Sequence, residues 1–173
     1  MKIILLGYMA SGKSTVGGLL AKIIDYDFID LDDYIEGKEG KSVSGIFKED
    51  GEVYFRKVEH IYLKELLSAR EKTVISLGGG TPCYANNMDL IKSDKNAISF
   101  YLKSSIDEIV NRLMNEKNQR PIVADIKSRE ALKEFVGKHL FERNPYYLRS
   151  DHVLETDEKT IQSIVEEIIF KLV

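Results

Sequence analysis

The run GYMASGKST from Gly7 to Thr15 has the residue types and spacing of a phosphate-binding loop. It matches the pattern G-x-x-x-x-G-K-[ST], in which glycines let backbone N–H groups turn toward phosphate oxygens. A helix expected to begin near Ser14 would direct the positive end of its dipole at the same anion. Lys13 can reach the terminal phosphates, and the Ser14 hydroxyl can ligate a magnesium ion. The loop 7–15 therefore predicts a site for a nucleoside triphosphate, for which we expect ATP.

The alternative interpretation of this run is a glycine-rich turn with an incidental lysine. The flanking sequence favours the phosphate loop, because an apolar segment precedes it and an amphipathic pattern follows it. The predicted nucleotide contacts within the loop are Ala10, Ser11, Gly12, Lys13, Ser14 and Thr15.

A pair of carboxylates ends the second apolar segment of the chain. Asp30 and Asp32 point to the same side of an extended backbone. One could hold Mg²⁺, and the other could accept a hydrogen bond from a substrate hydroxyl and orient it. The third apolar segment ends in Ser76-Leu77-Gly78, where many nucleotide hydrolases carry an acidic metal ligand, so its absence favours Asp30 for the metal. The alternative is a solvated acidic turn that caps the next helix.

Arginines supply the candidate anion contacts. Arg56 and Glu59 are three residues apart on a predicted helix and can pair, which would hold a planar guanidinium ready for a carboxylate. Arg143 lies where a helix is expected to end before Pro145. Arg120 lies in the polar, irregular segment 116–125, and from such a lid an arginine can stabilise charge on a transferring phosphoryl group. For each arginine the alternative is an exposed surface charge, and position alone does not decide.

Strands and helices are expected to alternate along the chain. The predicted strands are 3–6, 28–31, 73–77, 97–102 and 152–155, and the predicted helices are 14–24, 32–39, 42–49, 52–69, 106–115, 128–142 and 160–173, with a helical turn at 88–92. Such alternation indicates a parallel sheet covered on both faces in a layered α/β domain. Ligands of these sheets bind beyond the carboxyl ends of the strands. The segments that begin at Gly7, Asp30 and Gly78 are therefore expected to share one crevice.

Composition narrows the class of protein. The 173 residues are 43% hydrophobic and carry a formal net charge of −3, which suits one globular domain and does not indicate a nucleic-acid-binding surface. The apolar run at 3–6 is too short for a signal peptide, and no stretch approaches the roughly 20 apolar residues that span a bilayer. Cys83, the one cysteine, cannot form an internal disulfide and is expected to be a small packing residue, and the three histidines lack metal-ligand spacing. We expect a cytoplasmic protein without membrane or nucleic-acid partners.

These motifs occur together and in an order that resembles the shikimate kinase family. After the phosphate loop come Asp30-Leu-Asp32, Gly51-Glu52 leading to Phe55-Arg56 and Glu59, Gly78-Gly79-Gly80, Arg120-Pro121 and Arg143-Asn-Pro-Tyr-Tyr. The loop is common to many families, whereas Phe-Arg-x-x-Glu with the triple glycine is far more particular. The resemblance covers nearly the whole chain. It implies a single domain over 1–173 with the three-layer α/β fold of P-loop kinases, a five-stranded parallel sheet flanked by helices.

The resemblance also implies a reaction, the transfer of the terminal phosphoryl group of ATP to the 3-hydroxyl of shikimate in chorismate and aromatic amino-acid biosynthesis. It implies the following roles: Lys13, Asp32 and Arg120 in catalysis; Asp32, Arg56, Gly79 and Arg143 in shikimate binding; Ser14 and Asp30 at Mg²⁺; and Arg120 at the ATP phosphates. The substrate-binding helices would lie at about 32–60 and the lid at about 112–127.

The sequence allows alternatives to several of these assignments. Arg149 follows the last motif and could compete with Arg143 for the carboxylate, and the contact with the nucleotide base, expected near 157–159, has no fixed register. Another small-molecule kinase of this fold, such as a gluconate kinase, is the alternative enzyme. A nucleotide-dependent switch or binding module is the non-catalytic alternative, although the chain has no Asn-Lys-x-Asp motif for guanine. We expect a monomer.

Overall fold

A computed structural model describes residues 1–69, 71–116 and 121–173, the side chains of 121 and 122 excepted. These residues form a five-stranded, fully parallel sheet in the order β2-β3-β1-β4-β5. The strands are β1 (Lys2–Leu6), β2 (Asp27–Asp30), β3 (Thr73–Ser76), β4 (Ala97–Lys103) and β5 (His152–Glu155). The predicted parallel sheet is confirmed, with strand ends that differ from the expected ones by at most one residue.

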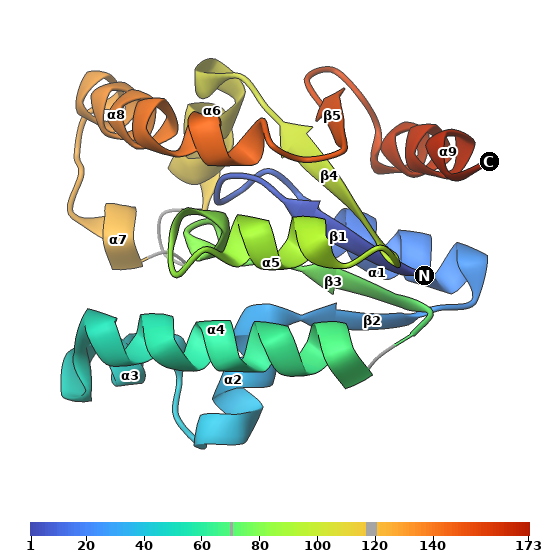
Figure 1. The fold of residues 1–173 in the computed structure, drawn as a ribbon. Helices are drawn as coiled ribbons and strands as arrows, with labels where there is room; N and C mark the ends of the chain where they lie inside the picture. Colours follow the sequence, from blue (N-terminus) through green and yellow to red (C-terminus); the bar gives the residue numbers. More distant parts are fainter. Residues whose placement is uncertain (70, 117–120) are drawn as a thin grey trace.

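Helices cover both faces of the sheet and complete three layers (Figure 1). They are α1 (Lys13–Ile24), α2 (Leu31–Glu39), α3 (Val43–Glu49), α4 (Gly51–Ala69), α5 (Asn87–Ser93), α6 (Ile106–Asn115), α7 (Pro121–Ala124), α8 (Arg129–Tyr147) and α9 (Ile161–Leu172), with a 3₁₀ turn η1 (Thr81–Cys83). Helices α1 and α9 share one face, and α4, α5 and α8 lie on the other.

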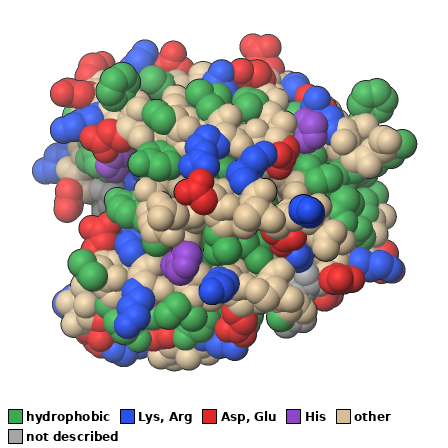
Figure 2. Space-filling model, viewed as in Figure 1, with side chains coloured by type: hydrophobic (Ala, Val, Ile, Leu, Met, Phe, Trp, Pro, Cys, Tyr) green, Lys and Arg blue, Asp and Glu red, His purple; other side chains and the backbone are tan. Residues whose placement is uncertain are grey.

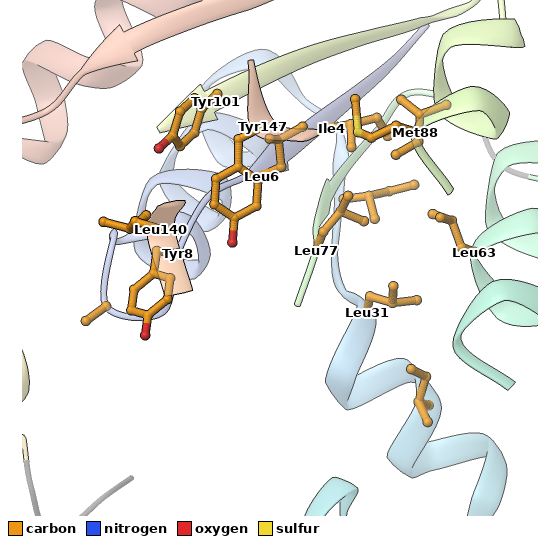
Figure 3. Close-up of a cluster of buried hydrophobic side chains, with 14 of the residues drawn as sticks. Ile4, Leu6, Tyr8, Leu31, Leu63, Leu77, Met88, Tyr101, Leu140 and Tyr147 are labelled. Atoms are coloured by element: carbon orange, nitrogen blue, oxygen red, sulfur yellow. The ribbon is translucent and has the colours of Figure 1, made fainter. Parts of the chain in front are cut away.

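Strand β1 explains why both faces need cover. Its side chains alternate, with Ile3 and Leu5 in the core toward α1 and α9 and Ile4 and Leu6 in the opposite core. All four are fully buried. Figure 3 shows the second of these cores, where Leu6 lies near Tyr147. Burial of one such side chain contributes roughly 1.5–3 kcal/mol, so β1 is held from two sides.

Hydroxyl side chains fix the starts of several helices. Ser42, Ser105, Ser128 and Thr160 each accept a hydrogen bond from the backbone N–H three residues later, at the starts of α3, α6, α8 and α9. Such N-caps satisfy backbone donors that have no partner within the helix. The caps account for α3, α8 and α9, which begin one residue after the predicted start, whereas α6 begins at the predicted Ile106.

The expected end of the helix before Pro145 is wrong, because α8 continues through this proline to Tyr147. The Leu148 N–H still donates to the Asn144 carbonyl at 2.9 Å, so the last turn is closed despite the missing proline donor. The Tyr147 side chain is fully buried, and this anchor outweighs the local preference.

The sequence predicts that the polar segment 116–125 is irregular, and this prediction is wrong for its second half. Residues Pro121–Ala124 form the short helix α7, in which Val123 is fully buried. Arg120 lies outside the described residues. In the described part of the chain, no helix is both long enough and apolar enough to cross a membrane.

Candidate functional site

A cavity of about 420 Å³ lies at the carboxyl ends of β1, β2 and β3. Its lining includes the phosphate loop, the acidic pair and the start of the glycine turn: Met9, Ala10, Gly12, Lys13, Ser14, Thr15, Asp30, Asp32, Ser76, Leu77, Gly78, Gly79, Arg112, Glu116 and Ile161. Strand β3 pairs with both β1 and β2, so these ends are neighbours in the sheet. The predicted convergence of three segments on one crevice is confirmed.

The phosphate loop needs its glycines for conformation and for space. Gly7 and Gly12 have φ angles of 149° and 87°, which side-chain-bearing residues rarely adopt. A Cβ at Gly7 would also lie 2.7 Å from the Leu102 carbonyl oxygen. Helix α1 begins directly after Gly12, so its first N–H groups and the positive end of its dipole lie at the cavity.

Lys13 is held close to the loop that it follows. Its ammonium donates to the carbonyl oxygens of Gly7 and Tyr8 at 3.0 and 2.9 Å. The side chain lines the cavity and is largely buried. A positive charge therefore lies at the loop, beside the space that a polyphosphate would occupy.

Oxygen atoms suited to Mg²⁺ gather beside the loop. The Ser14 hydroxyl donates to Asp30 Oδ2 at 2.8 Å, and Asp30 Oδ1 accepts from the Asp32 N–H at 3.0 Å. Asp30 is thus the N-cap of α2 as well as the partner of Ser14, so the two interpretations of this acid are compatible. Ser76 pairs with Asp30 in the register of β2 and β3 and takes the position of the missing acid.

The Ser76 hydroxyl is buried at the cavity wall and has no hydrogen-bond partner among the described residues. A buried polar atom without a partner is costly, so a ligand or its hydration shell would satisfy it. The described residues contain no group of three or more His, Cys, Asp or Glu arranged to hold a metal by itself. Mg²⁺ usually takes one or two protein carboxylates together with substrate phosphates and water, and the oxygens of Ser14, Asp30 and Ser76 fit that mode.

The Asp32 carboxyl lies in the first turn of α2 against Gly78. Burial, followed by the nearby charges of Asp30 and Glu59, raises the pKa of Asp32 to about 6. Lys13 acts in the opposite direction. The carboxylate is therefore ionised near neutral pH but more basic than an ordinary aspartate, which suits a group that accepts a hydrogen bond or a proton from a hydroxyl.

Three consecutive glycines bring the remaining candidates together. A Cβ at Gly78 would lie 3.0 Å from Asp32 Oδ1, and one at Gly79 would lie 3.3 Å from Arg143 Nη1. A Cβ at Gly80 would lie 2.7 Å from Arg56 Nη2. The turn 78–80 is thus in contact with the carboxylate and with both guanidinium groups, which come from α2, α8 and α4. Side chains on these glycines would displace all three.

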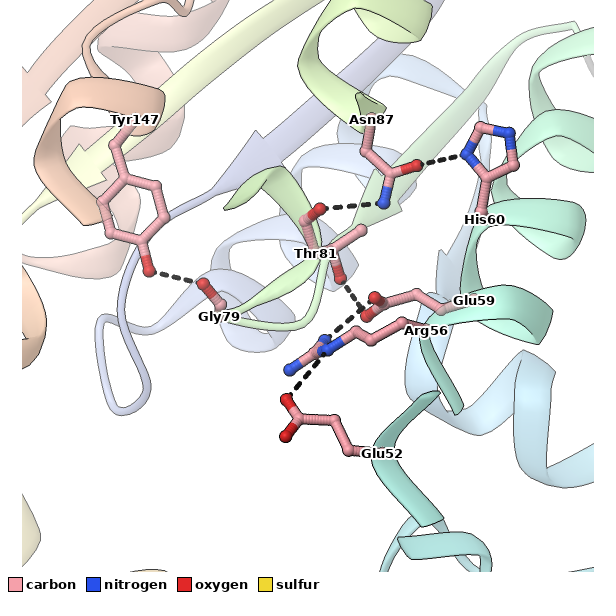
Figure 4. A network of polar contacts seen from close by, with 8 residues as sticks. All are labelled: Glu52, Arg56, Glu59, His60, Gly79, Thr81, Asn87 and Tyr147. Atoms are coloured by element: carbon pink, nitrogen blue, oxygen red, sulfur yellow. Dashed lines mark hydrogen bonds and ion pairs between the residues drawn. The ribbon is translucent and has the colours of Figure 1, made fainter. Parts of the chain in front are cut away.

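Arg56 is fixed by a buried network (Figure 4). Its Nη1 donates to Glu59 Oε2 at 2.9 Å, which confirms the predicted pair. Glu59 Oε1 accepts from the Thr81 hydroxyl at 2.6 Å, and only 1% of Glu59 is exposed. The guanidinium carbon lies 3.9 Å from the centre of the Tyr84 ring, a cation–π contact that fixes its plane.

The structure distinguishes Arg143 from Arg149, the two candidates for binding a carboxylate. Arg143 packs between Gly79 and the Tyr8 ring of the phosphate loop, with its guanidinium carbon 5.5 Å from the ring centre. Arg149 instead forms an ion pair with Asp89, and its side chain is 42% exposed. Of these two arginines, Arg143 is the one whose side chain lies against the glycine turn.

Arg112 is a cavity residue that the sequence interpretation missed. Its Nη1 donates to the Ala10 carbonyl at 3.0 Å and its Nε to Glu108 at 2.7 Å. It lines the cavity with Ile161, close to the segment where a base contact was expected. The spacing of Glu108 and Arg112 indicates a helical pair, but no local signal connects this pair with a loop 102 residues away.

Cys83 is a packing residue, as predicted from the sequence. It is partly buried and packs against the core that contains α4 and α8. Burial raises the pKa of its thiol to about 11, so the thiol stays protonated and unreactive near neutral pH.

Comparisons with known proteins agree with this geometry. The family model described as shikimate kinase matches residues 9–173. A shikimate kinase of Flavobacterium johnsoniae is 48% identical over 97% of this chain and 96% of its own length. Solved shikimate kinase structures from Bacteroides thetaiotaomicron and from Acinetobacter baumannii, the latter in complex with shikimate, are 35% and 31% identical, with TM-scores of 0.91 and 0.86. Each covers 99% of this chain, which covers 98% and 92% of theirs. The chain therefore belongs to the shikimate kinase family.

Proposed function

We propose that this chain transfers the terminal phosphoryl group of ATP to the 3-hydroxyl of shikimate, giving shikimate 3-phosphate and ADP. The observation that carries the proposal is the contact of the turn 78–80 with Asp32, Arg143 and Arg56 beside a phosphate loop. This arrangement suits a small acceptor that carries both hydroxyls and a carboxylate. The reaction is a step toward chorismate and the aromatic amino acids.

The acceptor is oriented by groups of opposite charge. Arg56 and Arg143 would bind its carboxylate, since planar guanidinium groups can make paired hydrogen bonds with carboxylate oxygens. Asp32 would accept a hydrogen bond from the reacting hydroxyl, and its raised pKa favours this task. The Gly79 carbonyl already accepts a bond from Tyr147, so the backbone contact with the acceptor would come from the Gly79 N–H.

Phosphoryl transfer depends mainly on position and on charge neutralisation. The N–H groups of the loop 7–15 and the Lys13 ammonium would hold the phosphates. Ser14 and Asp30 would hold Mg²⁺, directly or through water, with Ser76 as a further oxygen. When bound, the metal would neutralise phosphate charge. Asp32 would orient the acceptor hydroxyl and receive its proton as the new bond forms.

Further segments would form the walls of the site. Helices at about 32–60 would enclose the acceptor, and the region at about 112–127 would act as a lid from which Arg120 reaches the phosphates. The base would lie between Arg112 and Ile161, whose side chains are 3.8 and 3.9 Å from a Cβ built at Gly12. We also propose that the chain acts as a cytoplasmic monomer.

The decisive measurement is ADP release from Mg²⁺-ATP with shikimate, with gluconate and without an acceptor. We expect ADP release to depend on shikimate and to stay near the background with gluconate. The Asp32→Asn variant, purified in the same way, controls for contaminating kinases. Equal ADP release with and without shikimate would refute the proposal, and gluconate-dependent release would assign the alternative enzyme.

A further inference from the structure

Tyr147 is a buried phenol whose hydroxyl reaches the acceptor side of the site. It is the last residue of α8 and is fully buried. Its hydroxyl donates to the Gly79 carbonyl at 2.5 Å, across 68 residues of sequence (Figure 4). A tyrosine in an apolar core needs a polar partner for its hydroxyl, and here the partner belongs to the glycine turn.

Arg143 lies one helical turn before Tyr147, so the two side chains share a face of α8. The guanidinium lies against Gly79, the residue whose carbonyl Tyr147 binds. Burial lowers the pKa of Arg143, but the neighbouring side chains of Tyr147, Tyr8 and Cys83, with Tyr147 first among them, together raise it. A hydroxyl can accept from a guanidinium and donate to a carbonyl at once, and such chained hydrogen bonds strengthen one another.

We infer that Tyr147 is a positioning residue of the acceptor site, which holds the Arg143 guanidinium and the Gly79 peptide in one fixed unit. This inference rests on the proposed function, in which Arg143 and Gly79 meet the carboxylate of the acceptor. Tyr147 itself does not line the cavity described above. It acts through the two groups that it connects, so its loss should affect the acceptor and leave ATP largely unaffected.

Tyr101 offers a matched control. It comes from β4, is only 2% exposed, and its ring centre lies 5.0 Å from that of Tyr147. Its hydroxyl also donates to α8, to Asn144 Oδ1 at 2.9 Å. Removal of either hydroxyl therefore costs a buried hydrogen bond to a neighbouring element, but only one of them reaches the glycine turn.

The experiment compares the purified variants Tyr147→Phe and Tyr101→Phe in steady-state kinetics with Mg²⁺-ATP and shikimate. We expect Tyr147→Phe to raise the KM for shikimate by about tenfold, which corresponds to about 1.4 kcal/mol, with a KM for ATP within about twofold of the parent. Tyr101→Phe should change neither KM by more than about twofold. Equal shikimate KM values for the two variants would overturn the inference.

A second comparison tests whether Tyr147 and Arg143 act as one unit. If they do, Tyr147→Phe should add less than about twofold to the shikimate KM of Arg143→Lys, because the unit is already broken. Fully multiplicative effects would contradict the inference. If Tyr147→Phe does not fold, fluorotyrosine at position 147 keeps the hydroxyl, and its ¹⁹F signal should shift on addition of shikimate more than that of fluorotyrosine at position 101.

Failure of the inference is distinguishable from failure of the proposed function. A parent protein without shikimate-dependent ADP release would refute the function. If the parent is fully active but the ¹⁹F signal of fluorotyrosine at position 147 does not shift at saturating shikimate, only the role of Tyr147 is refuted.

Discussion

At the scale of single residues, the effect of a buried charge on stability can be distinguished from its use in catalysis. Asp32 is the clearest case, because burial and two neighbouring acids disfavour its ionised form. The same environment makes it a better acceptor for a hydroxyl proton than an exposed aspartate. The site therefore keeps a carboxylate that is unfavourable for stability, as expected of residues selected for chemistry.

Asp32→Asn should slow turnover and stabilise the free protein. We expect kcat to fall by at least about a hundredfold, because Asn cannot accept the proton. The pKa of Asp32 lies at about 6 in the folded chain against 3.8 in the unfolded one, so its contribution to stability is full below pH 4 and is lost as the pH rises through 6. The ionised form then costs roughly 3 kcal/mol, and Asp32→Asn at pH 7 should recover about 2 kcal/mol of it.

The measurement for this prediction is urea unfolding between pH 4 and 8, with EDTA and without nucleotide. Asp33→Asn is the matched control, because this neighbour is exposed and should change the stability much less. A variant Asp32→Asn that loses stability between pH 4 and 7 as steeply as the parent would contradict the prediction.

Arg143 and Arg149 give a second residue-scale test. Arg143→Lys should raise the KM for shikimate by about tenfold or more, since an ammonium cannot make the paired contacts of a guanidinium. Arg149→Lys should leave it within about twofold, because Arg149 pairs with Asp89 in an exposed position. Steady-state kinetics with varied shikimate checks both, and an equal loss in the two variants would remove the distinction that the structure draws.

At the scale of elements, three helices position the site, and each is held by a specific contact near the residue that it contributes. Asp30 caps α2 and so sets Asp32, while buried Glu59 sets Arg56 on α4. Helix α8 extends past Pro145 because Tyr147 is anchored in the core and on the glycine turn. Asp32, Arg56 and Arg143 thus lie on helices, whereas Gly79 lies in the turn after β3.

Adjacent glycines in α1 give a test of how this helix packs on the sheet. A Cβ at Gly17 would lie 2.5 Å from the Phe28 ring, whereas one at Gly18 would meet nothing within 4 Å. We expect Gly17→Ala to destabilise the protein by about 1–3 kcal/mol and Gly18→Ala to stabilise it by up to about 1 kcal/mol. Urea unfolding measures both, and the same sign for the two variants would show that α1 packs differently.

At the scale of the whole molecule, the parallel order of the sheet brings the functional segments together. Strands β1, β2 and β3 end at the same edge, so the phosphate loop, the acidic pair and the glycine turn meet there. The face shown in Figure 2 carries acidic and basic side chains interspersed. This pattern is unlike the concentrated basic surface of a nucleic-acid-binding protein.

The exposed surface leads us to expect a monomer. Large exposed apolar side chains such as Val53, Phe141 and Phe170 lie on three different helices, α4, α8 and α9. Single exposed side chains are normal for monomers, whereas stable dimers bury contiguous apolar area. Sedimentation equilibrium should give a mass near 19.7 kDa, and a mass of twice that value at micromolar concentration would contradict the expectation.

Features that depend on neighbours along the chain can be predicted from the sequence. The phosphate loop was evident because its glycines, Lys13 and Ser14 act within one turn of backbone. The Arg56–Glu59 pair followed from helical spacing, and the alternation of strands and helices predicted the layered parallel sheet. These patterns are local, so their physics is contained in short stretches of residues.

Features that join distant segments depend on the three-dimensional packing of the chain. It placed Arg143 rather than Arg149 at the glycine turn, brought Arg112 to Ala10, and extended α8 through Pro145 to bury Tyr147. The hydrogen bond from Tyr147 to Gly79 spans 68 residues and that from Arg112 to Ala10 spans 102. Such contacts arise when packing of the core fixes helices against the sheet, and no periodicity along the chain encodes which side chains then meet.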